Sequence, residues 1–282
     1  MRLVTFHDRT GSERVGRLDG EGEDARVIEL TARSMLNWLR GEGHAPAGRD
    51  HALRDVVVLA PVPLPPSVRD FYSYEGHVAT GWRRRGGEIP AAWYEAPVFY
   101  FSNPASIHAP GQPVRRPAGC EWLDFELEIA AVIGEDGGIA GFTLLNDWSA
   151  RDIQRREMTV GLGPAKAKDF ATSMGPWLVT PDELPFEDGR LHVSAAASLD
   201  GREITRTDAA EMHWAWPQLV AHAAKETRLR PGDVLGSGTL NHGCLLELNA
   251  DGGVDGEPRW LKPGDTVAIE AQGLGRLETP IV

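Results

Sequence analysis

The run LDFELEIA places three acidic residues, Asp124, Glu126 and Glu128, at alternating positions with apolar residues between them. Because successive side chains of a β-strand point to opposite faces, this spacing predicts a strand with an acidic face and an apolar face. Three like charges on one face repel one another unless a positive charge neutralises them. A divalent cation held by carboxylate oxygens would do so, and the run therefore predicts one strand of a metal site. The alternative is an edge strand whose acidic face is solvated.

Two further carboxylates are candidates to complete such a site. Asp147 follows the apolar run GFTLL and is expected at the end of a strand, and Asp70 stands in the segment RDFYSYEGH. A set made of Asp70, Glu126, Glu128 and Asp147 offers only oxygen, which suits Mg²⁺, Ca²⁺ or Mn²⁺ and disfavours zinc. Asp124 shares the face of Glu126 and Glu128, so the spacing leaves it open as a ligand.

His77 lies seven residues after Asp70 and is the candidate for acid–base chemistry. Histidine titrates near neutral pH, so a histidine beside a metal-bound substrate could act as a general base towards water. A partner carboxylate would orient the ring and stabilise its protonated form. The residues themselves do not identify that partner.

The elements that must position these residues are expected to be mostly short strands separated by glycine and proline. The expected strands cover residues 98–101, 126–133, 141–146, 177–180, 191–199, 245–248 and 266–269. Helical patterns are fewer and cover residues 74–82, 149–157 and 216–226. This balance favours a β-dominated α+β body over a parallel α/β sheet.

The first 60 residues are expected to form a small N-terminal α/β unit, with a hairpin of residues 3–6 and 14–18, a helix over 31–40 and a strand over 55–59. The proline-rich run PVPLPP at 61–66 then predicts a stiff, extended linker. We therefore divide the chain into domains 1–60 and 61–282.

Two similar segments, LRPGDV at 229–234 and LKPGDT at 261–266, share a leucine, a basic residue and then Pro-Gly-Asp. Pro-Gly favours a tight turn before a strand. The similarity predicts two turns of the same kind, each leading into a strand.

Charge and composition limit the class of protein. The formal net charge of -12 argues against nucleic acid as a partner. The only dense basic run, Arg83 to Arg85, is too short to form a basic patch that could bind nucleic acid. No apolar stretch approaches the ~20 residues that a membrane-spanning helix needs, and the opening MRLVTFHD lacks the apolar core of a signal peptide. With two cysteines far apart in the sequence, Cys120 and Cys244, a cytoplasmic enzyme with free thiols is expected.

Together, these segments resemble the fumarylacetoacetate hydrolase family. DFYSYEGH resembles its histidine-bearing segment, LDFELEIA its metal strand, and NDWSARDIQ at 146–154 its most specific stretch. AKDFATSMGPWLV from residue 167, SGT at 237–239 and LLEL at 245–248 continue the match in the same order. The resemblance covers roughly residues 61–282 and implies a mixed β-sandwich roll, usually in a homodimer.

The resemblance also implies a role for each matching residue. The ligands of the divalent cation, Mg²⁺ or else Mn²⁺ or Ca²⁺, would be Asp70, Glu126, Glu128 and Asp147. The residues expected to activate water and to stabilise negative charge are His77, paired with Glu247, and Gln154 and Lys168. The residues expected to contact the substrate are Tyr72, Tyr100, Thr239 and an arginine near Arg85.

The activity that the resemblance implies is hydrolysis of a C–C bond in a 1,3-diketo acid of the fumarylacetoacetate or acylpyruvate type. The same ligand set serves decarboxylases, isomerases, dehydratases and lyases that act on 2-oxo acids, and these remain alternatives, as does a non-catalytic metal-binding protein. The partner of His77 is open between Glu247 and Glu75, and the substrate-binding arginine is open among Arg83 to Arg85. Residues 73–95 could form a lid.

Overall fold

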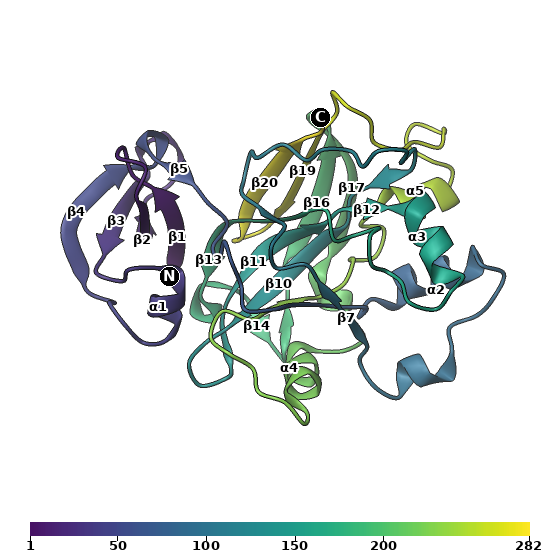
Figure 1. Cartoon of the computed structure of the whole chain (residues 1–282), viewed down its shortest axis with the longest axis horizontal. Helices are drawn as coiled ribbons and strands as arrows, with labels where there is room; N and C mark the ends of the chain where they lie inside the picture. The colour runs from purple at the N-terminus through teal and green to yellow at the C-terminus, as the bar shows by residue number, and fades with distance from the viewer.

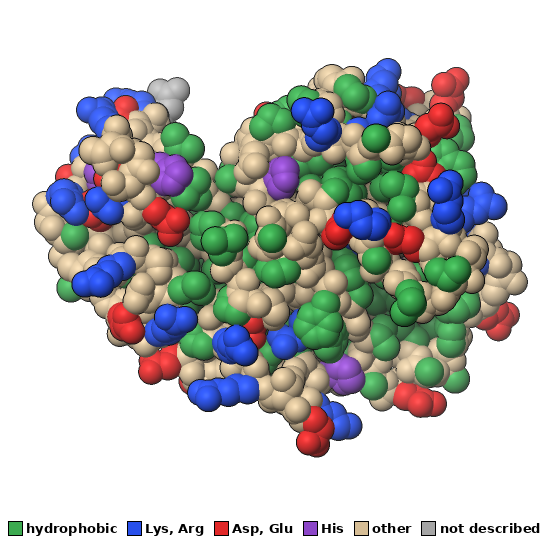
Figure 2. All heavy atoms as spheres, viewed as in Figure 1, with side chains coloured by type: hydrophobic (Ala, Val, Ile, Leu, Met, Phe, Trp, Pro, Cys, Tyr) green, Lys and Arg blue, Asp and Glu red, His purple; other side chains and the backbone are tan. Residues whose placement is uncertain are grey.

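The computed structural model describes residues 1–282, the side chain of Glu23 excepted. Figure 1 shows a small lobe of N-terminal strands at the left and a larger body at the right. Figure 2 shows a notch between lobe and body at the top of the view, and contact between them below it. The helices are α1 (Met35–Leu39), α2 (Glu75–Arg83), α3 (Arg151–Met158), α4 (Trp216–Ala224) and α5 (Leu245–Ala250). None of the helices in the described chain is long and apolar enough to cross a membrane.

A large mixed sheet runs through both parts of the molecule, in the order β4-β3-β2-β1-β13-β11-β10-β18-β6-β7. Its N-terminal strands are β1 (Arg2–His7), β2 (Glu13–Asp19), β3 (Arg26–Leu30) and β4 (Pro46–Ala52), with β5 (Val57–Val58) beside β1. Its strands in the body are β6 (Val68–Phe71), β7 (Phe99–Ser102), β10 (Leu127–Ile133), β11 (Ile139–Asp147), β13 (Thr172–Val179) and β18 (Val234–Gly236), with β8 (Ile107–His108) beside β13. The ladder between β1 and β13 joins the two parts, and the division at residue 61 stays a prediction.

A second sheet packs against this one, in the order β17-β16-β19-β20. Its strands are β16 (Ser194–Leu199), β17 (Arg202–Asp208), β19 (Thr266–Ala271) and β20 (Gly275–Pro280), and two short pairs join β9 (Leu123–Asp124) to β12 (Ser149–Ala150) and β14 (Phe186–Glu187) to β15 (Arg190–Leu191). The largest apolar core contains Leu127 and Ile129 of β10 together with Ala197 and Ile269 of the second sheet. The β-dominated α+β fold predicted from the sequence is thus confirmed.

Both faces of β10 are buried, which rules out a solvated acidic edge. The strand lies between β11 and β18, and its other face, with Ala130 and Val132, packs in a second core that contains Val68 and Val234. The apolar half of the LDFELEIA pattern therefore faces the core between the sheets. Its acidic half lies inside the protein as well.

The two Pro-Gly-Asp segments form the same turn. Asp233 accepts a hydrogen bond from the backbone N–H of Arg230 (2.8 Å), and Asp265 accepts one from Lys262 in the same way (2.9 Å). A strand, β18 or β19, begins at the residue after each aspartate. Each aspartate thus fixes the turn that leads into its strand.

One expected strand is wrong: residues 245–248 begin helix α5. The run LLEL is too short for periodicity to separate a strand from a helix. The expected helix over 31–40 is also shorter, because the hydroxyl of Ser34 accepts from the N–H of Asn37 and caps α1 there.

Candidate active site

Three neighbouring parts of the large sheet bring four carboxylates together. Asp70 lies on β6, Glu126 just before β10, Glu128 on β10, and Asp147 at the end of β11. One oxygen from each lies within 4.8 Å of the others. Strand β18 runs between β6 and β10 and has Gly236 at this level, where a Cβ would lie 2.2 Å from Asp70 Oδ1. The glycine leaves the space in which the carboxylates meet.

The cluster is buried and short of hydrogen-bond donors. Each of its four side chains is at most 4% exposed. Three oxygens, Asp70 Oδ1, Glu128 Oε2 and Asp147 Oδ1, have no hydrogen-bond partner. Buried carboxylate oxygens are normally paired, because leaving one unpaired costs free energy. A divalent cation would satisfy all three at once, and the all-oxygen donor set suits Mg²⁺, Mn²⁺ or Ca²⁺.

The shifted pKa values of the clustered carboxylates also indicate a site for a cation. Burial and the neighbouring charge of Asp147 raise the pKa of Asp70 well above its ordinary value. Burial and the charge of Asp70 do the same to the pKa of Glu128. Burial also acts to raise the pKa of Glu126, but Arg151 and Lys168 outweigh it, so that this pKa is lowered. The protein therefore ionises one carboxylate by itself and leaves the others in need of a further positive charge.

The cations already present bind Glu126 and Asp147. Lys168 Nζ donates hydrogen bonds to both carboxylates, and Arg151 Nη2 donates to Glu126 Oε1 at 2.7 Å. Tyr100 adds a hydroxyl, which donates to Asp147 Oδ2 at 2.6 Å. When all four carboxylates are ionised, one lysine and one arginine, which is shared with Asp124, leave at least two of the negative charges unneutralised. A divalent cation would neutralise them.

A histidine–glutamate pair lies directly beside the cluster. His77 Nδ1 is 2.7 Å from Glu247 Oε2, and His77 Nε2 is 3.8 Å from Glu126 Oε1. Burial opposes ionisation of Glu247, but the interaction with His77 and the hydrogen bond between them lower the pKa of Glu247. Helices α2 and α5, which carry the pair, contact each other, and both lie in the right-hand part of Figure 1. Glu75 is exposed and instead accepts from the Tyr94 hydroxyl (2.6 Å), so the structure pairs His77 with Glu247.

Asp124 does not join the four-carboxylate cluster. Its carboxylate accepts from the backbone N–H groups of Leu245 (2.7 Å) and Leu246 (3.0 Å) and from Arg151 Nε (2.8 Å). The free N–H groups at the start of a helix need such an acceptor, which explains why residue 245 begins a helix. The acid left open as a ligand by its spacing thus binds α5, the helix that carries Glu247.

The remaining predicted residues surround the cluster at different depths. Thr239 Oγ1 donates to Glu128 Oε1 at 3.4 Å, and the half-buried Gln154 accepts from Arg151 Nη1 at 3.1 Å. The ring of Tyr72 packs edge-on against His77, with centroids 5.4 Å apart, and burial raises the pKa of Tyr72 to about 12.

The structure separates the arginines of the basic run. A Cβ placed on Gly81 would lie 2.9 Å from Tyr72 Oη and 3.4 Å from Arg85 Nη2, so both groups reach the same side of α2. Arg83 turns away and donates to Thr80 Oγ1 (3.0 Å). Of these two arginines, Arg85 is therefore the one near Tyr72 and the site.

Sequence reasoning missed Arg151 and Cys244 as site residues. Arg151 stands inside the NDWSARDIQ stretch, directly after a strand, and that position was the available signal. Cys244 is fully buried, and its Sγ lies 3.4 Å from Glu247 Oε2. A lone cysteine without a nearby motif gave no such signal.

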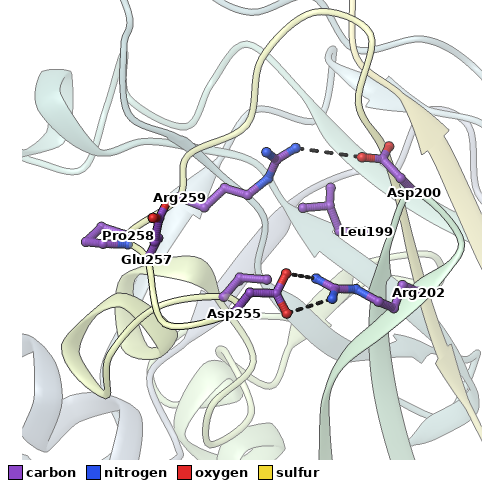
Figure 3. Close-up of a pocket in the computed structure, with 8 residues that line it drawn as sticks. Leu199, Asp200, Arg202, Asp255, Glu257, Pro258 and Arg259 are labelled. Atoms are coloured by element: carbon purple, nitrogen blue, oxygen red, sulfur yellow. Dashed lines mark hydrogen bonds and ion pairs between the residues drawn. The ribbon is translucent and has the colours of Figure 1, made fainter.

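A surface pocket of about 510 Å³ lies elsewhere, between the turn that joins β16 to β17 and the segment 254–259 (Figure 3). Its two arginines point at aspartates: Arg202 forms a two-pronged ion pair with Asp255, and Arg259 lies 3.7 Å from Asp200. None of the clustered carboxylates lines this pocket. Both arginines of the pocket are already paired with aspartates, so the carboxylate cluster remains the candidate for chemistry.

Comparison with known proteins gives a family match, related sequences and a similar solved structure. Residues 67–282 match the model of the fumarylacetoacetate (FAA) hydrolase C-terminal family. The chain is 32% identical to fumarylacetoacetase from Mus musculus, over 86% of this chain and 76% of that protein. It is 31% identical to fumarylacetoacetase from Bos taurus, over 65% of this chain, and spans only 58% of that protein's length. A crystal structure of 5-carboxymethyl-2-hydroxymuconate delta-isomerase from Mycobacterium smegmatis is similar over 100% of this chain and 99% of that one, with 28% identity and a TM-score of 0.77.

Proposed function

Because the chain belongs to the fumarylacetoacetate hydrolase family, we propose that it is a metal-dependent enzyme that hydrolyses a C–C bond of a 1,3-diketo acid. The observation that carries this proposal is the His77–Glu247 pair beside four buried carboxylates, three of which have an unpaired oxygen. A site for a cation next to a site for a base is the arrangement that activation of water against a carbonyl requires.

The proposed ligands are the four clustered carboxylates, Asp70, Glu126, Glu128 and Asp147. Once bound there, Mg²⁺ (or Mn²⁺ or Ca²⁺) would supply Lewis-acid polarisation of the substrate's oxygens. Lys168 holds Glu126 and Asp147 in place, since its ammonium group binds both carboxylates.

His77 is the proposed general base. Glu247 accepts a hydrogen bond from Nδ1–H, so Nε2 is the free acceptor on the side of the ring that faces the cluster. Nε2 takes a proton from water as the water oxygen attacks one carbonyl carbon of the substrate. The carboxylate of Glu247 stabilises the imidazolium that results.

Cleavage then divides the substrate into a carboxylic acid and an enolate. As the C–C bond breaks, its electron pair moves to the second carbonyl and forms the enolate. Lys168 and Gln154, which Arg151 orients, are the groups proposed to stabilise this negative charge. The proton held at His77 Nε2 goes to the enolate carbon, so water has been added across the bond.

The side chains expected to bind the substrate border this space. Tyr100 and Thr239 contact the ligands themselves, and Tyr72 packs on His77. Arg85, exposed and close to Tyr72, is the proposed partner of the substrate's carboxylate. Helix α2 would then close over the substrate as a lid. The homodimer and the cytoplasmic location stay predictions.

One alternative has specific support: isomerisation of an unsaturated 2-oxo acid. The whole-chain similarity to a structure described as a delta-isomerase favours it. Isomerisation moves a proton between carbons and adds no water, so the two reactions leave different products.

The test uses Mg²⁺- or Mn²⁺-loaded protein, a panel of acylpyruvates, fumarylpyruvate and unsaturated 2-oxo acids, and buffer made with ¹⁸O water. We expect loss of the diketone's ultraviolet absorbance, one ¹⁸O atom in the carboxylate product, and no turnover in excess chelator. Turnover of the unsaturated acids alone, with no ¹⁸O in the product, would replace hydrolysis by isomerisation.

A further inference from the structure

Asp124 has both carboxylate oxygens hydrogen-bonded, although it is neither a proposed ligand of the cation nor a proposed substrate-binding residue. It is fully buried, with Oδ1 accepting from the N–H of Leu245 and Oδ2 from the N–H of Leu246 and from Arg151 Nε. These donors lie on two helices, α5 and α3, and none is closer than 27 residues in sequence. A single side chain thus holds two distant segments together.

On one side, Asp124 fixes the position of the glutamate of the catalytic pair. Leu245 and Leu246 are the first two residues of α5, and Glu247 is the third. The helix has only 6 residues, so its own hydrogen bonds hold it weakly. Anchoring its first turn sets where Glu247 meets His77.

On the other side, Asp124 fixes the arginine that binds a proposed metal ligand. The guanidinium of Arg151 donates through Nε to Asp124, through Nη2 to Glu126 (2.7 Å) and through Nη1 to Gln154 (3.1 Å). Because the guanidinium is planar and rigid, the bond at Nε sets the direction of the other two. The position of Glu126 therefore depends on Asp124 as well.

We propose that Asp124 is a positioning residue that couples the His77–Glu247 pair to the carboxylate cluster, by binding α5 and Arg151 with one carboxylate. This role rests on the proposed function, in which both halves act on one substrate. Asparagine is nearly the same size but has a single acceptor oxygen. In Asp124→Asn the amide NH₂ must face at least one of the three donors, which loosens either α5 or Arg151.

The first test reads the geometry without any substrate. In wild-type protein labelled with ¹⁵N-histidine, the His77 Nδ1 proton should give a downfield signal that Glu247→Gln abolishes. We expect Asp124→Asn to weaken or move this signal. Asp265→Asn is the matched control: Asp265 is also buried and also binds an arginine (Arg259, 2.8 Å) and a backbone N–H, but lies outside the cluster. An unchanged His77 signal in folded Asp124→Asn would overturn the proposal.

The second test is a double-mutant cycle on kcat. Asp124→Asn alone should lower kcat by roughly tenfold to a hundredfold, as expected when a catalytic group is displaced by a fraction of an ångström to an ångström. In the Glu247→Gln background the same change should cost less than about threefold, because the group being positioned is already lost. Purely additive effects would overturn the proposal, since a general loss of stability acts equally in both backgrounds.

If Asp124→Asn does not fold, Asp124→Glu takes its place in both tests. It keeps the negative charge for Arg151 but moves the oxygens by one methylene, so the same displacement of Glu247 is expected. The two proposals fail separately. If no substrate is turned over, the proposed function fails and the His77 signal still decides the role of Asp124.

Discussion

The unpaired oxygens of the carboxylate cluster lead to a stability prediction for Glu128→Gln. In the wild type, Glu128 Oε2 and Asp70 Oδ1 face the same space, and no other group donates a hydrogen bond to either oxygen. Glutamine keeps the oxygen that accepts from Thr239 and replaces the other by an NH₂ group that can donate to Asp70. The substitution therefore removes a repulsion and provides a hydrogen bond that the wild-type pair makes only while one of its two carboxyls is protonated.

The size of the effect follows from these contacts. Pairing a buried acceptor that was unpaired is worth about 1–3 kcal/mol in the free energy of unfolding. For a chain of this size that corresponds to a rise in Tm of roughly 2 to 10 °C without metal. The wild type should gain about 2.7 kcal/mol from a cation at a hundred times its Kd. Glu128→Gln, which lacks one ligand, should gain much less.

The assay is thermal unfolding at pH 8 of the wild type, Glu128→Gln and Asp265→Asn, each in excess chelator and again with Mn²⁺. We expect Glu128→Gln to be the most stable of the three in chelator and the least stabilised by Mn²⁺. Asp265→Asn should respond to Mn²⁺ as the wild type does, because Asp265 lies outside the cluster. A Glu128→Gln protein that is less stable than the wild type in chelator, or that gains as much from Mn²⁺, would refute the metal site.

Three further predictions follow from other parts of the molecule. Glu247→Gln should lower kcat by about 10²- to 10⁴-fold and leave the affinity for Mn²⁺ nearly unchanged. Glu75→Gln is the control and should keep the wild-type kcat, because Glu75 is exposed and does not bind His77. Arg85→Ala should raise KM for a diketo acid by about tenfold and leave kcat nearly unchanged, and an effect on kcat alone would argue against binding of the carboxylate. Burial acts to raise the pKa of Glu29, but Arg49 outweighs it and lowers this pKa overall. The contribution of Glu29 to stability is therefore full above the ordinary carboxyl pKa and is lost as the pH falls through the lowered pKa. In Glu29→Gln the free energy of unfolding, measured from about pH 2 to pH 6, should depend less steeply on pH than in the wild type.

Local spacing in the sequence was enough to predict the division of β10 into two faces. A period of two in LDFELEIA is a property of the strand itself, so it assigns Leu127 and Ile129 to the core and Glu126 and Glu128 to the opposite face, whatever lies beside the strand. The polar residue after an apolar strand likewise predicted where Asp147 would lie. The β-dominated α+β fold followed from many short apolar runs between glycines and prolines.

Tertiary structure alone decided what lies opposite each of these side chains. Whether the acidic face is solvated depends on the strands beside β10, one of which, β18, comes about a hundred residues later. The choice of Glu247 over Glu75 depends on a contact across 170 residues, and the helical state of residues 245–248 depends on Asp124, 121 residues before Leu245. Spacing along a chain determines the faces of one element, whereas charge neutralisation and helix capping are contacts between elements. The same alternation therefore predicted three acids on one face, and the family resemblance implied that Glu126 and Glu128 are ligands. Only the folded chain showed what Asp124 binds, namely α5 and Arg151.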